Sequence, residues 1–513
     1  MTVPLQLGPA SEFAAVRAFL QAAGFTLPAV AARLHQTLPY DFTVLRPGPA
    51  DTDPQDALEM LIRVFVLGEA AAPAQIAGWV PGEAFAAMQT LGLLAPYAEA
   101  PGRLYSPVTL CPVDGVYVAS ERWTQPDGSP FSWPPDAVYP ALTRNTQVFL
   151  GNLSRQPCDR LLDLCSGSGV AALVAAAGFA THAVAADIAP RSTAFTEFNR
   201  RLNALENVTV VEGDLYEPVK GQTFDYILAH PPYVPVLRPG YLYRDGGTDG
   251  EEITRRIIEG LPVFLRPGGV FQCHTSVSDR ELMLEQRIRE WLGEKQAEFD
   301  VVLIIWIELD PERFVLASAA KERGLEDLKS WKKLFQEWKV RNLLDVSISL
   351  IRHGEAREPL DLRRQGGDNS GPPEVDWLLR WLRIAALPET HAALLRSRPK
   401  AAAGLRFTVT HVVEEDELRA ANCRAGVPYP FAVEVEMDRW MPLLLAACNG
   451  RRTGLELMAG MCQQGHIPAD TPPEKFAALL AAMISRGFIV VPEFAPPQTL
   501  KAMTENQPLP VAK

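Results

Sequence analysis

Apolar and polar positions change rhythm near residue 140. From there to residue 353, short apolar runs with strand character alternate with longer segments whose apolar positions recur every three to four residues. Strands are predicted at 158–165, 182–188, 207–214, 224–229, 268–276, 299–307 and 343–353, and helices at 170–179, 193–205, 253–265 and, as an insertion, 326–340. This alternation predicts a doubly wound, mostly parallel α/β domain with a Rossmann-like fold, which we place at residues 136–360.

The two flanks of this domain have a different pattern. In residues 1–135, three helical segments between 54 and 95 precede a strand–turn–strand segment at 103–123, an order typical of a winged helix. Residues 375–513 have a similar rhythm, with three helical segments between 441 and 486 and a short strand after them. We therefore expect a helical, winged-helix-like domain on each side, with the polar, breaker-rich segment 363–374 as a linker.

Charge and cysteine content narrow the classes of partner and site. The net charge is −12, and residues 1–150 contain 7 basic and 13 acidic side chains, whereas residues 311–513 contain 27 and 25. An acidic N-terminal domain is a poor partner for a phosphate backbone, so nucleic acid is disfavoured. The seven cysteines form no CxxC pair, so we expect neither a metal site nor a disulfide framework.

The hydrophobic pattern predicts no membrane segment. The longest strongly apolar run, 301–307, is far shorter than the ~20 residues that span a bilayer. The first residues lack the basic and apolar regions of a signal peptide. We therefore expect a cytoplasmic protein without a membrane partner; its oligomeric state does not follow from the sequence.

The turn between the first predicted strand and helix has the sequence DLCSGSG, at 163–169. Gly167 and Gly169 permit positive φ angles and close approach of a ligand to the backbone, and Cys165 is a small side chain that fits the turn. Asp163 brings a carboxylate to the same place, which disfavours a pyrophosphate and favours a cationic ligand. S-adenosylmethionine (SAM), which carries an ammonium and a sulfonium, meets this requirement. A glycine-rich turn without a ligand is the alternative.

The next two strands also end in acidic residues. Asp187, followed by Ile188, is placed to accept hydrogen bonds from both ribose hydroxyls of SAM, although capping of the next helix is an alternative role. Asp214 is placed to accept from the adenine amino group, with Leu215 against the ring. Because ligands of such sheets bind at the carboxyl ends of the strands, these residues predict one cofactor site.

The fourth strand ends in AHPPYVP, at 229–235. At this point the sequence resembles the class I SAM-dependent methyltransferases that act on planar nitrogen, which carry Asn, Asp or Ser, two prolines and an aromatic residue here. DGGTDG at 245–250 and RPGGVF at 266–271 are similar to the HemK-like branch, the release-factor glutamine methyltransferases. The resemblance covers roughly residues 140–280. It implies a class I methyltransferase fold, an N-methyltransferase activity, SAM as cofactor and S-adenosylhomocysteine as product.

The resemblance implies that His230, Pro231, Pro232 and Tyr233 are the catalytic residues. The lone pair of an amide nitrogen is delocalised, so the site must hold the nitrogen in line with the methyl group and accept its N–H groups. The prolines fix φ and have no N–H, so the local carbonyls face the substrate in a rigid loop. Tyr233 offers a flat face for a planar group.

His230 departs from the family, whose Asn supplies a hydrogen-bond acceptor. Three interpretations stay open. A neutral imidazole can replace the Asn as acceptor, and with a pKa near 6.5 this would be sensitive near neutral pH. His230 can instead act as a general base. Alternatively, it marks a domain that binds SAM, as part of the cofactor site, without transferring methyl groups.

Several functions are consistent with these residues. The resemblance favours methylation of a protein substrate, at a glutamine or another side chain. The alternatives are a base such as adenine in RNA or DNA, a small molecule with His230 as base, and a SAM-binding adaptor without turnover. Arg238, Tyr241 and Tyr243 follow the HPPY motif and are further candidates for contact with the substrate.

Overall fold

The computed structural model describes residues 3–35, 53–236, 240–314, 325–353, 358–367, 370–414 and 417–497. The chain divides into two compact units. One comprises Met1–Gly151, Gln156–Leu303 and Ile307–Leu362. The other comprises Asn152–Arg155, Ile304–Trp306 and Arg363–Lys513. The N-terminal segment and the α/β domain therefore belong to the same compact unit.

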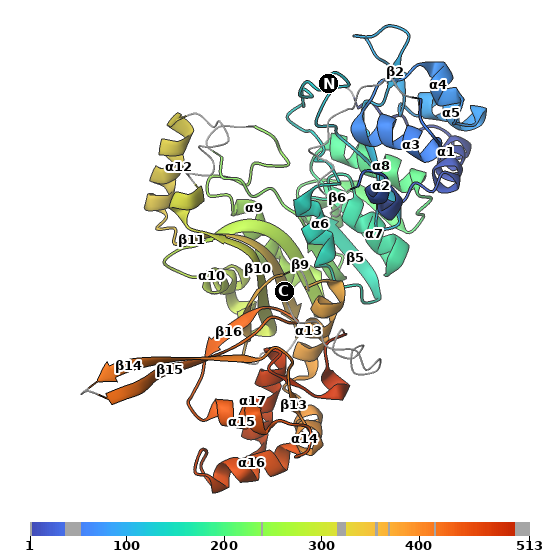
Figure 1. The fold of residues 1–513 in the computed structure, drawn as a ribbon. Coiled ribbons are helices and arrows are strands. Elements are labelled where there is room, and N and C mark those ends of the chain that lie inside the picture. Colours follow the sequence, from blue (N-terminus) through green and yellow to red (C-terminus); the bar gives the residue numbers. More distant parts are fainter. Residues whose placement is uncertain are drawn as a thin grey trace. The chain divides into compact units, whose positions relative to one another are not determined.

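An eight-stranded sheet organises the first unit, in the order β12-β10-β11-β9-β8-β5-β6-β7 (Figure 1). The strands are β5 (Cys158–Leu164), β6 (Ala180–Asp187), β7 (Val208–Glu212), β8 (Phe224–Ala229), β9 (Leu265–Asp279), β10 (Phe299–Leu309), β11 (Asn342–Arg352) and β12 (Asp361–Gln365). Strands β5 to β9 pair in parallel, and β11 pairs antiparallel with β9. The predicted doubly wound, mostly parallel α/β fold is confirmed.

The four predicted helices are present as α7 (Val170–Gly178), α8 (Pro190–Leu202), α9 (Glu252–Phe264) and the inserted α12 (Leu325–Glu337). Two further helices, α6 (Arg144–Gly151) and α10 (Leu284–Leu292), were not predicted. The run FDYILA is the central strand β8, whose Phe224, Ile227 and Leu228 are fully buried. Burial on both faces explains why this strand reads as a continuous apolar run rather than an alternating one.

The N-terminal segment contains more elements than predicted. Its helices are α1 (Ala10–Ala22), α2 (Leu27–Arg33), α3 (Ala57–Leu61) continued by η2 (Ile62–Leu67), α4 (Pro73–Ala77) and α5 (Gly82–Thr90). Two hairpins follow: β1 (Ala95–Pro96) with β2 (Leu104–Tyr105), and β3 (Thr109–Val113) with β4 (Val116–Ser120). The strand–turn–strand predicted at 103–123 is present as β3 and β4, whereas the short hairpin of β1 and β2 was not predicted. The winged-helix assignment stays a prediction.

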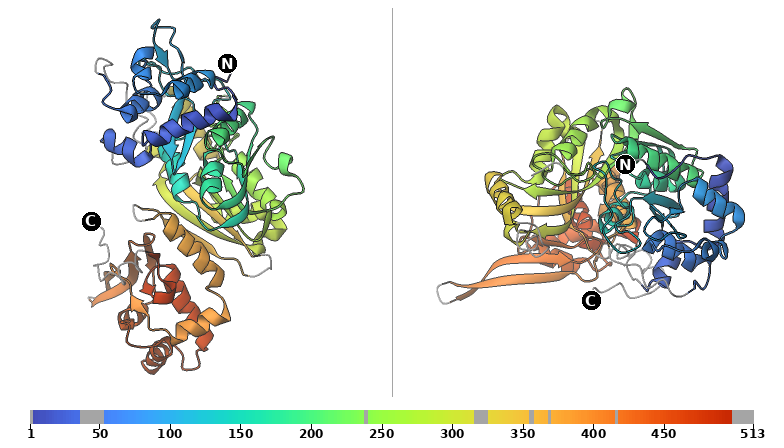
Figure 2. Two further views of the ribbon diagram at one scale, coloured as in Figure 1. Left: turned by 90° about the vertical axis from the view of Figure 1, so that its right-hand side faces the viewer. Right: turned by 90° about the horizontal axis from the view of Figure 1, so that it is seen from above.

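Two asparagines of α8 fasten the second hairpin to the α/β domain. Asn199 accepts from the N–H of Ala119 (2.8 Å) and donates to its carbonyl (2.9 Å). Asn203, one turn later, makes the same pair of bonds to the backbone of Tyr117 (2.8 and 2.7 Å). Each side-chain amide thus makes to β4 the pair of hydrogen bonds that a residue of a neighbouring strand would make. The N-terminal elements accordingly lie beside α7 and α8 in Figures 1 and 2.

The second unit contains α13 (Pro372–Ile384), α14 (Pro388–Arg396), β13 (Lys400–Ala401), β14 (Arg406–Glu414), β15 (Glu417–Val427), β16 (Val433–Glu436), α15 (Met441–Ala447), α16 (Gly454–Gln463), α17 (Pro473–Ser485) and β17 (Ile489–Val490). The helices predicted between 441 and 486 and the strand after them are present. The predicted linker at 363–374 is too long, because β12 continues to Gln365 and α13 begins at Pro372. Prolines are favourable in the first turn of a helix, where no intrahelical N–H bond is lost.

Within the described residues, no single helix is long and apolar enough to cross a bilayer; α1 and α2 meet that criterion only as a bent pair.

Replacement of Asn199 by leucine should lower the free energy of unfolding by about 3 kcal/mol. The change leaves the buried N–H and C=O of Ala119 without partners, and each such group costs about 1–3 kcal/mol. Chemical denaturation measures the loss. Thr193→Ala, on the same helix, removes only an exposed bond to the carbonyl of Pro190 and should change stability by less than about 0.5 kcal/mol. A stable Asn199→Leu protein would contradict the role given to these bonds.

Candidate active site

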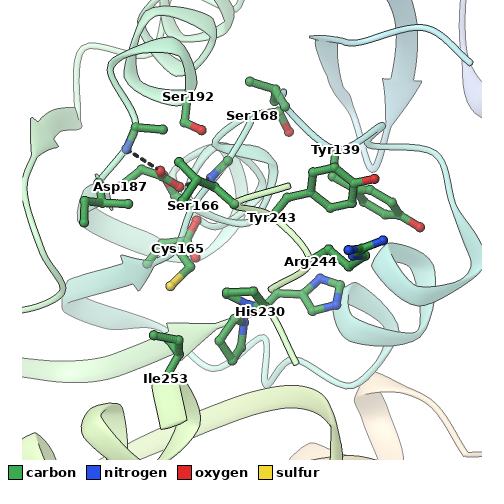
Figure 3. Close-up of a pocket in the computed structure, with 18 of the residues that line it drawn as sticks. Tyr139, Cys165, Ser166, Ser168, Asp187, Ser192, His230, Tyr243, Arg244 and Ile253 are labelled. Atoms are coloured by element: carbon green, nitrogen blue, oxygen red, sulfur yellow. Dashed lines mark hydrogen bonds between the residues drawn. The ribbon is translucent and has the colours of Figure 1, made fainter. Parts of the chain in front are cut away.

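A pocket of about 570 Å³ lies where β5, β6 and β8 end. Figure 3 shows two groups of side chains around it. Cys165, Ser166 and Asp187 lie on one side, and Tyr139 and Tyr243 lie on the other. Eleven of the twelve residues that we predicted from the sequence line this pocket: Asp163, Cys165, Gly167, Asp187, Ile188, Asp214, Leu215, His230, Pro231, Pro232 and Tyr233. Gly169 is not part of its lining.

The DLCSGSG turn has left-handed backbone at every second residue. The φ angles of Cys165, Gly167 and Gly169 are +56°, +55° and +78°. A Cβ on Gly169 would come within 2.5 Å of the Thr196 side chain, so close packing against α8 requires glycine there. A Cβ on Gly167 would meet no atom within 4 Å, and this open space faces the pocket. Burial raises the pKa of the Cys165 thiol well above its usual value, so the thiol is neutral and not a nucleophile.

The side chain of Asp163 reaches the pocket, and one of its carboxyl oxygens already accepts a hydrogen bond. Its Oδ2 accepts from the backbone N–H of Ala172 in the first turn of α7 (3.1 Å). Burial raises the pKa of this carboxyl to about 7, although the N–H bond from Ala172 opposes the shift. A cation placed beside the carboxyl would favour its ionised form. The residue therefore fits the ammonium of SAM, whose positive charge would offset the cost of ionising a buried carboxyl.

Asp187 organises the backbone as well as facing the pocket. Its Oδ2 accepts from the N–H of Gly167 and its Oδ1 from the N–H of Ala189, both at 2.9 Å (Figure 3). Burial raises its pKa, and these bonds oppose the shift. Each oxygen keeps a second lone pair, so the ribose hydroxyls can still be accepted. Ile188 is 56% exposed at the pocket wall, an apolar surface suited to a bound nucleoside.

Asp214 has a partner that the sequence did not indicate. Its Oδ2 forms an ion pair with Arg256 of α9 at 2.6 Å. Oδ1, and the second lone pair of Oδ2, can still accept from an adenine amino group. Leu215 lies against the pocket with its backbone in the left-handed region, at φ +49°. The predicted roles of both residues fit this arrangement but stay predictions.

His230 is enclosed by other rings. Its ring centroid lies 5.2 Å from that of Phe149 and 5.6 Å from that of His274, a residue of β9 that the sequence analysis did not single out. Burial lowers the pKa of His230 to about 4 and that of His274 well below its usual value. The imidazole is therefore neutral at pH 7. The expectation that its role as hydrogen-bond acceptor is pH-sensitive near neutrality is wrong.

The HPPYVP stretch is held rigidly by the glycine-rich segment that follows it. Val234 donates to the carbonyl of Arg244 (2.8 Å), and Gly246 donates back to the carbonyl of Val234 (2.9 Å). A Cβ on Gly246 would lie 2.7 Å from the carbonyl oxygen of Pro232, and one on Gly250 would lie 2.5 Å from that of Tyr233. The two motifs therefore form one unit, in which glycine is needed for the backbones to approach each other.

Tyr233 is positioned from α6. Asn145 donates from Nδ2 to its hydroxyl oxygen (2.5 Å). Burial raises the pKa of Tyr233, so the hydroxyl is protonated and its hydrogen is free to point at a substrate. Asn145 was missed in the sequence because it lies 88 residues away from Tyr233. Arg238 lies outside the described residues.

Three further pocket residues come from the N-terminal loop: Trp123, Asp136 and Tyr139. None of the three was predicted as a site residue from the sequence. Of the described residues, no group of three or more His, Cys, Asp or Glu side chains is arranged to hold a metal ion.

Comparison with known proteins places this pocket in a family. The profile of the methyltransferase small domain matches residues 139–300. A ribosomal protein uL3 glutamine methyltransferase of Bradyrhizobium diazoefficiens is 34% identical over 168 residues, which are 30% of this chain and 52% of that protein. A protein of Methanocaldococcus jannaschii, provisionally named as a protein N5-glutamine methyltransferase, is 35% identical over 144 residues, or 27% of this chain and 71% of that protein.

A release factor glutamine methyltransferase of Geobacter sulfurreducens is 35% identical over 137 residues, 24% of this chain and 48% of that protein. The chain thus spans about half the length of two of these relatives. Among solved structures, a ribosomal protein L11 methylase of Lactobacillus delbrueckii is 18% identical, covering 38% of this chain and 71% of that protein, with a TM-score of 0.23.

Replacement of Asp163 by asparagine should weaken SAM binding by about 10- to 100-fold, because a charge-assisted bond is worth roughly 1.5–3 kcal/mol. Since the carboxyl has a pKa of about 7 before a cation binds, affinity in the wild type should also fall as the pH drops below 7. Titration calorimetry between pH 5.5 and 8.5 measures both effects. Asp159→Asn, exposed at the start of the same strand, should change neither. A pH-independent wild type would contradict this account of Asp163.

The neutral state of His230 should appear in the pH dependence of stability. Its pKa is about 4 in the folded protein and about 6.5 when unfolded. The unfolded chain therefore binds an additional proton between these values, and the wild type should lose about 1–3 kcal/mol as the pH falls from 6.5 to 4. His230→Asn lacks this titrating group, so its loss of stability over the same pH range should be smaller by about 1–3 kcal/mol. Chemical denaturation at each pH measures the difference. His411→Asn, at an exposed histidine, should behave like the wild type.

Proposed function

The chain belongs to the class I, HemK-like family of SAM-dependent methyltransferases, and from this premise we propose that it methylates the side-chain amide nitrogen of a glutamine in another protein. One observation carries the proposal: His230, Pro231, Pro232 and Tyr233 line the same pocket as the acidic residues suited to SAM. The names of the relatives, which are glutamine methyltransferases of ribosomal proteins and release factors, support the protein amide as acceptor.

The residues suit an amide nitrogen for a physical reason. The nitrogen becomes nucleophilic only when its lone pair is held in line with the methyl group, and its N–H groups then need acceptors. The neutral imidazole of His230 supplies one acceptor, and the carbonyls of the proline stretch supply others. The protonated Tyr233 hydroxyl is suited to donate to the amide oxygen and fix the plane of the group.

SAM supplies an electrophilic methyl group on its sulfonium. Transfer of this methyl group would form a nitrogen–carbon bond and break the carbon–sulfur bond, with S-adenosylhomocysteine as leaving group, and the proton lost by the nitrogen would pass to solvent water. His230 is a poor general base for that proton, because a base is most effective when its pKa is near the working pH and burial lowers this one to about 4. The acceptor role is therefore the one that we propose for His230.

Incubation with labelled SAM and a protein extract of the source cells tests the function. We expect label that protease removes and nuclease does not, and a mass increase of one methyl group on a glutamine of the labelled protein. Label in nucleic acid would identify a base as the acceptor instead. Bound SAM without formation of S-adenosylhomocysteine would identify an adaptor.

The role of His230 predicts an order of activities among its variants. His230→Asn keeps an acceptor at this position and should retain at least about a tenth of the turnover number. His230→Ala removes the acceptor and should lose about 100-fold, in the range seen when one hydrogen-bonding group that stabilises a transition state is lost. SAM affinity, measured separately, should change little in either. An inactive His230→Asn with normal SAM binding would favour the general-base role instead.

A further inference from the structure

Five aromatic rings form a continuous cluster at the mouth of the pocket, which we call the aromatic wall: Trp123, Trp133, Tyr139, Tyr241 and Tyr243. Neighbouring centroids are 4.7 Å apart for Trp123 and Trp133, 5.6 Å for Trp133 and Tyr243, 5.1 Å for Tyr139 and Tyr243, and 5.4 Å for Tyr241 and Tyr243. The rings come from two segments a hundred residues apart. A backbone bond from the N–H of Leu242 to the carbonyl of Pro135 (2.9 Å) joins these segments.

The wall faces the side of the pocket that we expect to bind the methyl-accepting group, which we call the acceptor side. Trp123, Tyr139 and Tyr243 line the pocket. Tyr139 and Tyr243 lie on the side opposite Asp187 (Figure 3). Trp123 is 38% exposed and Leu242, beside it in the lining, is 52% exposed. Large apolar side chains left exposed around a pocket mark a contact surface for a partner. The wall is therefore placed to touch whatever carries the methyl-accepting group.

The electron-rich faces of these rings favour a cation. The chain already provides an example, because the guanidinium of Arg244 lies 5.9 Å from the centre of the Tyr241 ring. A second basic group, brought by a partner, would meet Trp123, Tyr139 and Tyr243 in the lining of one pocket. The rings alone would equally accept a flat neutral group, so the charges around them decide between the two.

The charged side chains of the lining leave one carboxylate unmatched. The lining contains Asp136, Asp163, Asp187, Asp214, Asp245, Arg244 and Arg256. Arg244 pairs with Asp245 (3.1 Å), and Arg256 pairs with Asp214 (2.6 Å). Asp163 and Asp187 belong to the cofactor side. Asp136 is half-buried between two wall residues in sequence and has no hydrogen bond or ion pair to any described residue.

We propose that the aromatic wall and Asp136 bind a basic side chain, Arg or Lys, that lies next to the methylated residue in the substrate, so that the substrate is a basic protein segment. This inference rests on the proposed function and names its substrate class. A half-buried carboxylate gains most from a cation that brings hydrogen-bond donors. A nucleic-acid strand would place its phosphates against Asp136 and be repelled, so the same charge disfavours it.

A set of peptides with one central glutamine tests this directly. Arg, Ala or Glu is placed at each of the four positions on either side, and kcat/KM for methyl transfer is measured for each peptide. We expect Arg at one or two positions to exceed Ala by about tenfold and Glu to fall below Ala. Asp136→Asn should reduce the advantage of Arg to less than about threefold, mainly through KM, while the Kd of SAM stays unchanged.

The control is Asp127→Asn, in the same loop. It makes the same change of charge at an exposed side chain bonded only to Ser129, and it should leave the preference for Arg intact. Trp123→Leu and Tyr243→Leu should each weaken the preference without changing SAM affinity.

Three results would overturn the inference. Equal rates for Arg and Ala peptides would remove it while amide methylation stands. A weaker SAM affinity in Asp136→Asn, with the preference for Arg unchanged, would assign Asp136 to the cofactor. Methyl transfer to RNA that increases in Asp136→Asn, without transfer to any glutamine peptide, would overturn both this inference and the proposed function.

Discussion

The hydrogen bonds of Asn199 connect three parts of the molecule that the site requires. Its amide pairs with the backbone of Ala119 in the second N-terminal hairpin, and its Nδ2 also donates to the carbonyl of Ser168 in the glycine-rich turn (2.9 Å). A buried ion pair between Glu121 and Arg191 (2.6 Å) fixes the same junction. The loop that begins at Trp123 therefore starts from a fixed point. The geometry of the aromatic wall depends on this anchor as much as on its own ring contacts.

Burial shifts the pKa values of two site residues, Asp163 and His230, in opposite directions. It raises the pKa of Asp163 to about 7, so the carboxyl is ready to pair with a cation. It lowers the pKa of His230 to about 4, so the imidazole is neutral and able to accept a hydrogen bond. In both cases burial of the side chain penalises its charged form. The same cause thus favours a cation beside Asp163 and a neutral hydrogen-bond acceptor at His230.

The two sides of the pocket have different origins. The cofactor side consists of strand ends and the turn of the α/β domain, where parallel topology brings the residues together. The acceptor side combines the HPPY motif with α6 and with a loop of the N-terminal segment, at Tyr233, Asn145 and Tyr139. In the proposed function, the α/β domain would provide the chemistry and the loop that contains Trp123 and Tyr139 would contact the substrate.

Local pattern predicted seven of the eight strands of the sheet, and eleven of the twelve predicted site residues line one pocket at the strand ends. Strand and helix periodicities are properties of short windows, and acidic strand ends meet at one edge once the strands are parallel. The hairpin with its turn at Asp114–Gly115 was also predicted. The short hairpin of β1 and β2 was not, and neither was β12, which falls at the start of the predicted linker.

Only the tertiary structure decided the rest. Asn145 and Tyr233 are 88 residues apart, and the two halves of the aromatic wall are about as distant, so no local window contains both partners. The neutral state of His230 likewise depends on Phe149 and His274, which come from a helix and a strand on either side of it in the chain. Sequence gives the identity of these residues. Their pKa values and partners arise from burial and contact, which exist only when distant segments fold against each other.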